Sequence, residues 1–259
     1  MHENIAYTLE AKFGPQTRSQ AALLARHYEY AGRSTTAFNY WLQAAQWARH
    51  LFSSSEALRI LSHAENIVLT SSDSISDKLI HDFYIEWTEL SYEIGDSEQI
   101  RKHNNSLYEI GQAKNSKLLI GTALVGNSVA CLVENEFEDG LAYTNQAIPY
   151  LKTTDNAFEL MSSHTNRGVY LYMLGRLNEA IESFELALSL GNADGDPSIQ
   201  RGMANAHYHL GLSQTLAGWP ELGLKNAKTS LELANDIGHL LTSIEDFMDL
   251  HYLWVWINP

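Results

Sequence analysis

Three carboxylates are the residues whose spacing comes nearest to supporting chemistry. Glu86, Glu89 and Glu93 follow one another at helical intervals in the stretch IEWTELSYEIGDSE. Such a stripe could supply a paired acid and base, although solvated carboxylates on a helix surface are far more common. The sequence also lacks a phosphate-binding G-x-x-x-x-G-K-[ST] loop and a G-x-S-x-G turn. We find no catalytic arrangement and expect a protein that is not an enzyme.

The histidines do not form a zinc site. His207 and His209 are two residues apart on a predicted helix, so their rings point to roughly opposite sides. No other pair of histidines has the i, i+4 spacing that would place two ligands on one helical face.

A short acidic stretch resembles the start of a calcium loop. NADGD, residues 192–196, places one Asn and two Asp at alternate positions. The sixth position is Pro197, where a calcium loop needs Gly, and the twelfth is Met203, where it needs Glu. A polar linker that caps the next helix is the better interpretation, and we expect neither a metal nor a cofactor.

Composition and charge limit the classes of partner. The 259 residues are 45% hydrophobic and 19% charged, with a formal net charge of −14. Without a cluster of Lys and Arg, nucleic acid is not an expected ligand. The single cysteine, Cys131, sits in an apolar stretch and suits a small buried residue in a reducing compartment. The amino terminus has no secretory pattern, and the most apolar stretch, LLIGTALVGNSVACLV, is shorter than a bilayer requires, so we expect a cytoplasmic protein that does not enter membranes.

Helical periodicity runs through the whole chain, and no stretch alternates as a strand would. We therefore predict an all-α protein of about 13 helices. The first covers the stretch ENIAYTLEAKF, and the others begin near Ser19, Ser34, Ser54, Asp77, Glu98, Ser116, Glu138, Asn156, Asn178, Ser198, Pro220 and Gly238.

Turns recur at a step of about forty residues. Gly95, Asn135 and Gly175 are 40 residues apart, and Gly218 lies 43 residues further on. Small residues stand at fixed distances from these turns, seven places before and five places after, with Ile100 as the exception. They are Thr88, Ser128, Gly168, Gly211, Gly140, Ala180 and Gly223. We expect these positions to be contact points between paired helices that stack and share one core.

The repeated unit resembles a tetratricopeptide repeat. HTNRGVYLYMLGRLNEAIESFELAL carries Gly168, Leu171, Gly175, Ala180, Phe184 and Ala187 at the signature positions of the motif. The resemblance implies a right-handed α-α superhelix, a tetratricopeptide-like solenoid. Near the start, Ala37 and Ala57 are 20 residues apart, so one helix fits two registers and the phase of the repeat stays open.

The step of forty exceeds the usual 34 residues of the motif. This long form is similar to the repeat region of the bacterial maltose-regulon activator and related multidomain signalling ATPases. The opening segment, 1–70, is similar to the segment that joins the ATPase core to the repeats in large bacterial regulators and cyclase-linked ATPases. We predict one repeat domain over 1–259, with degenerate repeats in 1–70, four helix pairs in 77–237 and a capping helix in 238–257.

The resemblance implies a protein- or peptide-binding module, the interaction or regulatory part of a bacterial signalling or transcription regulator. The alternative is a sensor whose groove binds a small molecule or peptide effector. The closely spaced Lys and Arg set that clamps carboxy termini in some family members is missing, so a basic or neutral segment is the better partner. The residues expected to line the concave groove are Glu86, Glu89, Tyr92, Asn127, Asn166, Tyr172, Asn205 and His209.

The carboxy-terminal stretch FMDLHYLWVWINP carries an apolar stripe of Phe247, Leu250, Trp254 and Ile257. Because terminal repeats normally have a polar outer face, we expect either further repeats to cover this stripe or a homodimer to form through it.

Overall fold

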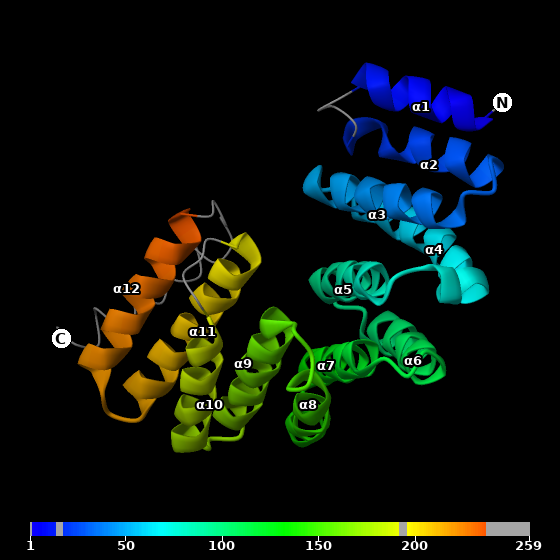
Figure 1. Ribbon diagram of the computed structural model, residues 1–259. Helices are drawn as coiled ribbons and strands as arrows, with labels where there is room; N and C mark the ends of the chain where they lie inside the picture. The colour runs from blue at the N-terminus through cyan, green and yellow to red at the C-terminus, as the bar shows by residue number, and fades with distance from the viewer. Residues whose placement is uncertain (1, 14–17, 192–195, 237–259) are drawn as a thin grey trace. The chain divides into compact units, whose positions relative to one another are not determined.

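The described part of the chain is entirely built of helices (Figure 1). The computed structural model describes residues 2–13, 18–191 and 196–236. Within them lie twelve α-helices: α1 (His2–Phe13), α2 (Ala21–Tyr30), α3 (Ser34–His50), α4 (Ser54–Ser71), α5 (Asp77–Glu93), α6 (Ser97–Ala113), α7 (Lys117–Glu134), α8 (Phe137–Leu151), α9 (Ala157–Met173), α10 (Leu177–Leu190), α11 (Pro197–Leu216) and α12 (Pro220–Asp236). The all-α prediction is confirmed.

The predicted helix starts agree with the observed ones to within two residues in every described helix from α2 onward. Side-chain caps explain part of this agreement. Ser76, Asp96 and Asn156 each accept a hydrogen bond from the amide three residues later, and Asp196 accepts one from the Ser198 amide at 2.8 Å. Asp196 therefore caps α11, as the linker interpretation predicts. The predicted thirteenth helix, from Gly238, lies outside the described residues.

The same turn joins most successive helices. In each case one residue adopts a positive φ, and the amide of the following residue donates to the carbonyl five positions before it, which satisfies a helix-terminal acceptor. The positive-φ residues are Gly32, Phe52, Gly95, Asn115, Asn135, Gly175 and Gly218. The turns predicted at 95, 135, 175 and 218 are thus confirmed, and those at 52 and 115 show that the motif also recurs at half the step.

The chain divides into two compact units, residues 1–119 and 120–259. In the first unit, α2, α3 and α4 pack against one another in chain order, and α5 packs against α6. Its core includes an aromatic pair: Phe38 of α3 lies 5.0 Å from Phe83 of α5, centroid to centroid, and both are fully buried.

Contacts between alternate helices settle the phase of the repeat. In the first unit α3 contacts α5, and in the second α9 contacts α11. Because first helices of neighbouring repeats lie side by side in such arrays, α3 corresponds to α9 and pairs with α4. The ambiguity around Ala37 and Ala57 is thereby resolved.

Small residues lie at the contacts between helices in the second unit. A side chain at Gly168 of α9 would meet the ring of Phe184 in α10 at 2.5 Å, and one at Gly140 of α8 would meet the ring of Tyr170 in α9 at 2.4 Å. Ala180 and Ala187 of α10 are fully buried. The predicted role of these positions as contact points is confirmed.

The closest approach is between α11 and α12. A Cβ at Gly223 would lie 2.0 Å from the Thr215 hydroxyl oxygen and 2.7 Å from the Gly211 carbonyl oxygen. A Cβ at Gly211 would lie 2.8 Å from the Gly223 carbonyl oxygen. Two backbones are in contact here, so neither glycine can take a side chain without moving a helix.

Helix α7 is the apolar stretch noted in the sequence. By length and composition it could cross a membrane, yet 67% of it is buried inside the protein. Cys131 within it is fully buried, as predicted. These are the properties of a core helix.

We predict that Gly223→Ala lowers the free energy of unfolding by about 1–2 kcal/mol, since the cost of overpacking exceeds the gain in helix propensity. The matched control is Gly202→Ala in α11, whose added Cβ meets the flexible end of Met161. Urea unfolding measures both. Equal effects of the two substitutions would contradict the contact between the α11 and α12 backbones.

Candidate functional site

One guanidinium and three carboxylates form a charged cluster among the described residues of the first unit. Arg49, near the end of α3, lies 2.6 Å from Glu89 and 2.6 Å from Glu93, nitrogen to oxygen, and 3.3 Å from Glu86. All three carboxylates come from α5, where the helical repeat places them on the side that faces α3. The cluster holds one positive and up to three negative charges.

Burial shapes the electrostatics of this cluster. Only 8% of the Glu86 side chain is exposed, compared with 24% for Arg49. Burial raises the pKa of Glu86, and the charge of Arg49 opposes this rise. Burial also lowers the pKa of Arg49, but hydrogen bonding to Glu93 and the charges of Glu89 and Glu86 outweigh it and raise that pKa above its usual value.

The structure brings together three of the residues predicted for the groove. Glu86 and Glu89 share Arg49, and Tyr92 on the same helix is 48% exposed. The expectation of a solvated carboxylate stripe is wrong for Glu86, because the prediction did not include its partner on α3.

The other predicted groove residues lie in the second unit. Asn127 of α7 is buried. Its side chain therefore does not line an open groove, contrary to the expectation. Asn166 and Tyr172 of α9 are half-buried, Asn205 of α11 is exposed, and His209 stacks on Phe184 with ring centroids 5.8 Å apart.

Burial lowers the pKa of two histidines in the second unit. Burial, helped by the charges of Lys152 and Arg167, lowers the pKa of His164 to about 4. Burial alone lowers the pKa of His209 to about 4. The lowered pKa favours a neutral imidazole at His209, whose ring is partly exposed and stacks on Phe184.

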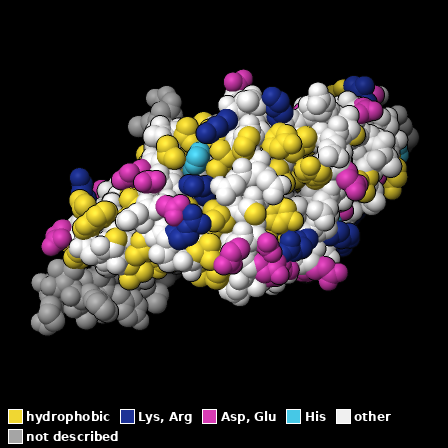
Figure 2. Space-filling model, turned by 90° about the horizontal axis from the view of Figure 1, so that it is seen from below, with side chains coloured by type: hydrophobic (Ala, Val, Ile, Leu, Met, Phe, Trp, Pro, Cys, Tyr) yellow, Lys and Arg dark blue, Asp and Glu magenta, His cyan; other side chains and the backbone are white. Residues whose placement is uncertain are grey.

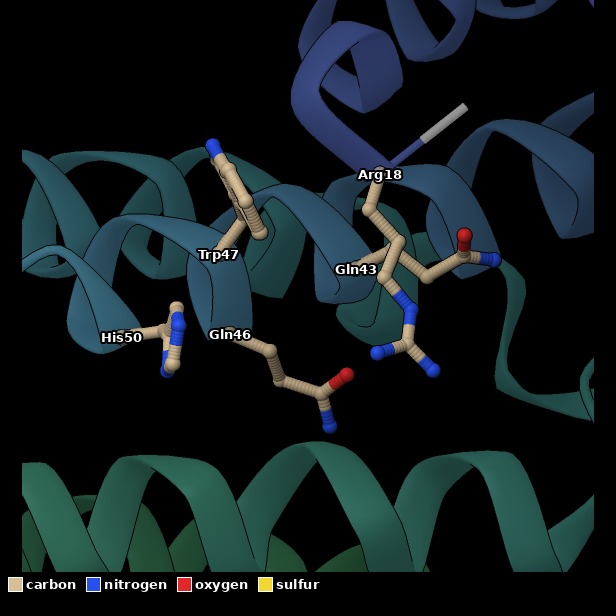
Figure 3. A pocket seen from close by; sticks show the side chains of 5 residues that line it. All are labelled: Arg18, Gln43, Gln46, Trp47 and His50. Carbon is tan, nitrogen blue, oxygen red and sulfur yellow. The ribbon is translucent and has the colours of Figure 1, made fainter. Parts of the chain in front are cut away.

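A surface pocket on α3 contains residues that the sequence analysis did not select. Gln43, Gln46, Trp47 and His50 follow the spacing i, i+3, i+4, i+7 and, with Arg18 just before α2, surround a cavity of about 240 Å³ (Figure 3). We call these four residues of α3 the α3 row. Its spacing was readable in the sequence, but only the fold shows that α3 is the first helix of its pair.

The charged side chains are mixed in sign on the face drawn in Figure 2, where acidic and basic groups are interspersed among hydrophobic and uncharged ones. Among the described residues no group of three or more His, Cys, Asp and Glu side chains could hold a metal ion. The apolar stripe from Phe247 to Ile257 lies outside the described residues.

Solved structures with the same architecture share little sequence with this chain. BtubC from P. vanneervenii superposes with a TM-score of 0.66 at 15% identity, over 86% of this chain and 90% of that one. The Rap conjugation gene regulator of plasmid pLS20, in complex with the Phr* peptide, superposes with a TM-score of 0.65 at 16% identity, over 87% of this chain and 61% of that one. A signal transduction ATPase with a tetratricopeptide repeat sensor, from Pyrococcus horikoshii, gives 0.60 at 16% identity, over 98% of this chain and 42% of that one.

The fold is tetratricopeptide-like. At these identities the likeness establishes the architecture and no more. No protein-family profile and no curated protein matches the sequence. The tetratricopeptide-like assignment identifies α3, α5, α9 and α11 as first helices of their pairs, which places the α3 row and the Arg49 cluster on helices of the class expected to line a groove.

We predict that Arg49→Met lowers the free energy of unfolding by about 2 kcal/mol, because it leaves three facing carboxylates, one of them buried, without their cation. The control is Arg59→Met, which breaks an exposed ion pair with Glu56 within α4 and should cost less than about 1 kcal/mol. Urea unfolding at neutral pH measures the free energy of unfolding of both variants. Equal decreases in the two variants would mean that the cluster contributes no more to stability than a surface ion pair.

We predict that His164 makes the protein less stable in acid. Its pKa of about 4 in the folded state lies below the roughly 6.5 of an unfolded chain, so the unfolded state binds more protons between these values. Stability is therefore complete above about pH 6.5 and falls as the pH is lowered toward 4. Thermal melts across this range should show a flatter pH dependence for His164→Leu, and an unchanged slope would contradict the prediction.

Proposed function

We propose that this chain is a non-enzymatic module that binds an extended protein segment or peptide, as the interaction or regulatory part of a bacterial signalling or transcription regulator. The observation that carries the proposal is the α3 row beside its pocket. It presents two amides, an indole and an imidazole along one accessible edge of a first helix. We further propose a cytoplasmic location.

The chemistry of the row suits a peptide backbone. Each glutamine amide both donates and accepts hydrogen bonds, as does each peptide group of an extended segment. Trp47 adds an apolar surface that stays partly exposed in the described structure, and such aromatic groups often dominate binding energy. Together these groups can hold a backbone and select one side chain.

Charge favours a neutral or basic segment over an acidic one. Arg49 is already engaged by three carboxylates, and the net charge of the chain is −14. An acidic segment would meet repulsion over most of its approach.

Three structural neighbours support this class of function without assigning it. One is a Rap regulator in complex with the Phr* peptide, and another is a Rap protein complexed with Competence and Sporulation Factor. A third is Cut9 of the APC/C, in a hetero-tetramer with Hcn1. Each of these structures is a complex with a further molecule.

A small-molecule sensor is the second candidate, favoured by the tetratricopeptide repeat sensor named among the neighbours. The pocket is small for that role. Its volume of about 240 Å³ lies below the roughly 300–1,000 Å³ usual for sites that enclose a ligand. A segment that lies across the pocket and inserts one side chain fits it better.

Within the first unit, Tyr92 stays a proposed binding residue. Within the second unit, Asn166, Tyr172 and Asn205 stay proposed binding residues. For the stripe from Phe247 to Ile257 we retain the proposal of a homodimer or of further covering repeats.

We predict that the row decides peptide affinity. Dodecapeptides selected from a random phage-displayed library should bind Gln46→Ala/Trp47→Ala at least about tenfold more weakly than the unsubstituted protein, as loss of a central aromatic contact implies. Fluorescence anisotropy with labelled synthetic peptides measures this.

The matched control is Gln146→Ala/Trp219→Ala, which removes the same residue types from exposed positions of the second unit. It should change affinity less than about twofold. A library from which no peptide is enriched, or peptides that bind both double variants equally, would reject the proposed site.

A further inference from the structure

The side chains around the pocket on α3 carry hydrogen-bonding groups that no described residue occupies. Arg18 and the four residues of the α3 row line this cavity of about 240 Å³, and none of the five makes a hydrogen bond or an ion pair with another described residue. The guanidinium has five N–H donors and no acceptor, the indole only donates, and each glutamine amide donates and accepts. The pocket therefore offers a ligand more donors than acceptors.

The positive charge of Arg18 is available to a ligand in this pocket. By contrast, Arg33, Arg59 and Arg176 each lie within 3.1 Å of a carboxylate oxygen, and Arg49 pairs with three carboxylates. None of the described residues that line the pocket is acidic, so none of them competes for the Arg18 guanidinium. The pocket is thus locally positive in a chain whose net charge is −14.

The arrangement of the side chains directs this charge toward the amides of α3. Arg18 reaches the pocket from the segment just before α2, and Figure 3 shows its side chain extending toward the Gln46 amide, with Gln43 beside it. Trp47 and His50 lie toward the other end of the row, with ring centroids 5.6 Å apart. A carboxylate placed at Arg18 can accept hydrogen bonds from the guanidinium and from the Gln46 amide, while the indole can cover the aliphatic part of its side chain.

A single guanidinium favours a carboxylate over the other anionic group that protein segments carry. A carboxylate forms two parallel N–H···O bonds with a guanidinium, and such charge-assisted pairs are among the stronger hydrogen bonds. A phosphorylated side chain carries about two negative charges and would find only one arginine or lysine among the described residues that line the pocket. The negative charge of the chain also repels it more strongly than a carboxylate.

We propose that the pocket is a subsite for the side chain of one aspartate or glutamate of the bound segment, held by an ion pair with Arg18 and a hydrogen bond from Gln46. The inference rests on the proposed function for the segment and adds the class of the side chain that enters the pocket. The rest of the segment stays neutral or basic, because the net charge of −14 acts on it outside the pocket. Arg18 is thus a specificity determinant, and the other groups of the α3 row contact the neighbouring peptide groups.

The test is a double-mutant cycle between Arg18 and the peptide. The dodecapeptides selected on the unsubstituted protein are synthesised with amidated carboxy termini, and each Asp or Glu is replaced in turn by Asn or Gln. At one acidic position the replacement should weaken binding to the unsubstituted protein at least about fivefold. It should weaken binding to Arg18→Gln less than about twofold, because the ion pair is already absent there. Fluorescence anisotropy measures the four affinities, and circular dichroism confirms that the variant is folded.

The matched control is Arg26→Gln on α2, which makes the same change of net charge at an exposed position outside the pocket. In this control the replacement in the peptide should have the same effect as in the unsubstituted protein. The amidated termini distinguish the two sources of a carboxylate. Selected peptides that bind only with a free carboxy terminus would assign the ion pair to that terminus and reject the side chain as its partner.

Three further results would overturn the subsite. The first is that no acidic residue of the selected peptides affects their affinity. The second is an equal effect of the peptide replacement on the unsubstituted protein and on Arg18→Gln. The third is an equal loss of peptide affinity in Arg18→Gln and Arg26→Gln, which would mean nonspecific repulsion by an acidic protein.

The failure of the subsite and the failure of the proposed function are distinguishable. If the selected peptides need Gln46 and Trp47 but show no coupling to Arg18, the subsite fails and the proposed function stands. If Gln46→Ala/Trp47→Ala binds the peptides normally while the coupling to Arg18 persists, the α3 row fails and the ion pair with Arg18 stands. A library from which no peptide is enriched rejects both.

Discussion

The close approach of paired helices is the constraint on which the rest of this structure depends. In the second unit, Gly168 leaves space for Phe184, and Gly211 and Gly223 bring two backbones into contact. A helix pair packed in this way has little freedom to slide, because interiors at this density resist small shifts. Side chains on the outer faces are then presented from a rigid support, which a binding surface built on helices requires.

The turns complete this constraint. Each ends its helix with a positive-φ residue and a hydrogen bond back to the preceding turn, so helix length and exit direction are fixed together. Glycine is used at most of these positions because it adopts this conformation without strain, while Phe52 adopts it with its side chain 95% exposed. Within each unit, regular turns keep successive first helices side by side, as the contact of α3 with α5 in the first unit and of α9 with α11 in the second indicate.

The fold was largely readable from the sequence, whereas the candidate site was only partly so. Helix starts follow from capping residues and periodicity, which act over a few neighbouring residues, and the small residues of α9 and α10 follow from the repeat. The partnership of Arg49 with Glu86 joins residues 37 apart, and no local pattern encodes it. For the same reason the burial of Asn127 and the accessibility of Trp47 could be learned only from the packing of helices.

Stability alone does not explain the composition of the Arg49 cluster. A buried carboxylate such as Glu86 carries a desolvation cost that Arg49 offsets only in part, and an apolar residue of similar volume is often neutral or stabilising at such a place. Glu89 and Glu93 are more exposed, with 30% and 41% of their side chains open to solvent, so each contributes less to stability through its pair with Arg49. One reason for such a cluster is specificity of packing, because the three ion pairs to a single guanidinium fix which face of α5 meets the end of α3.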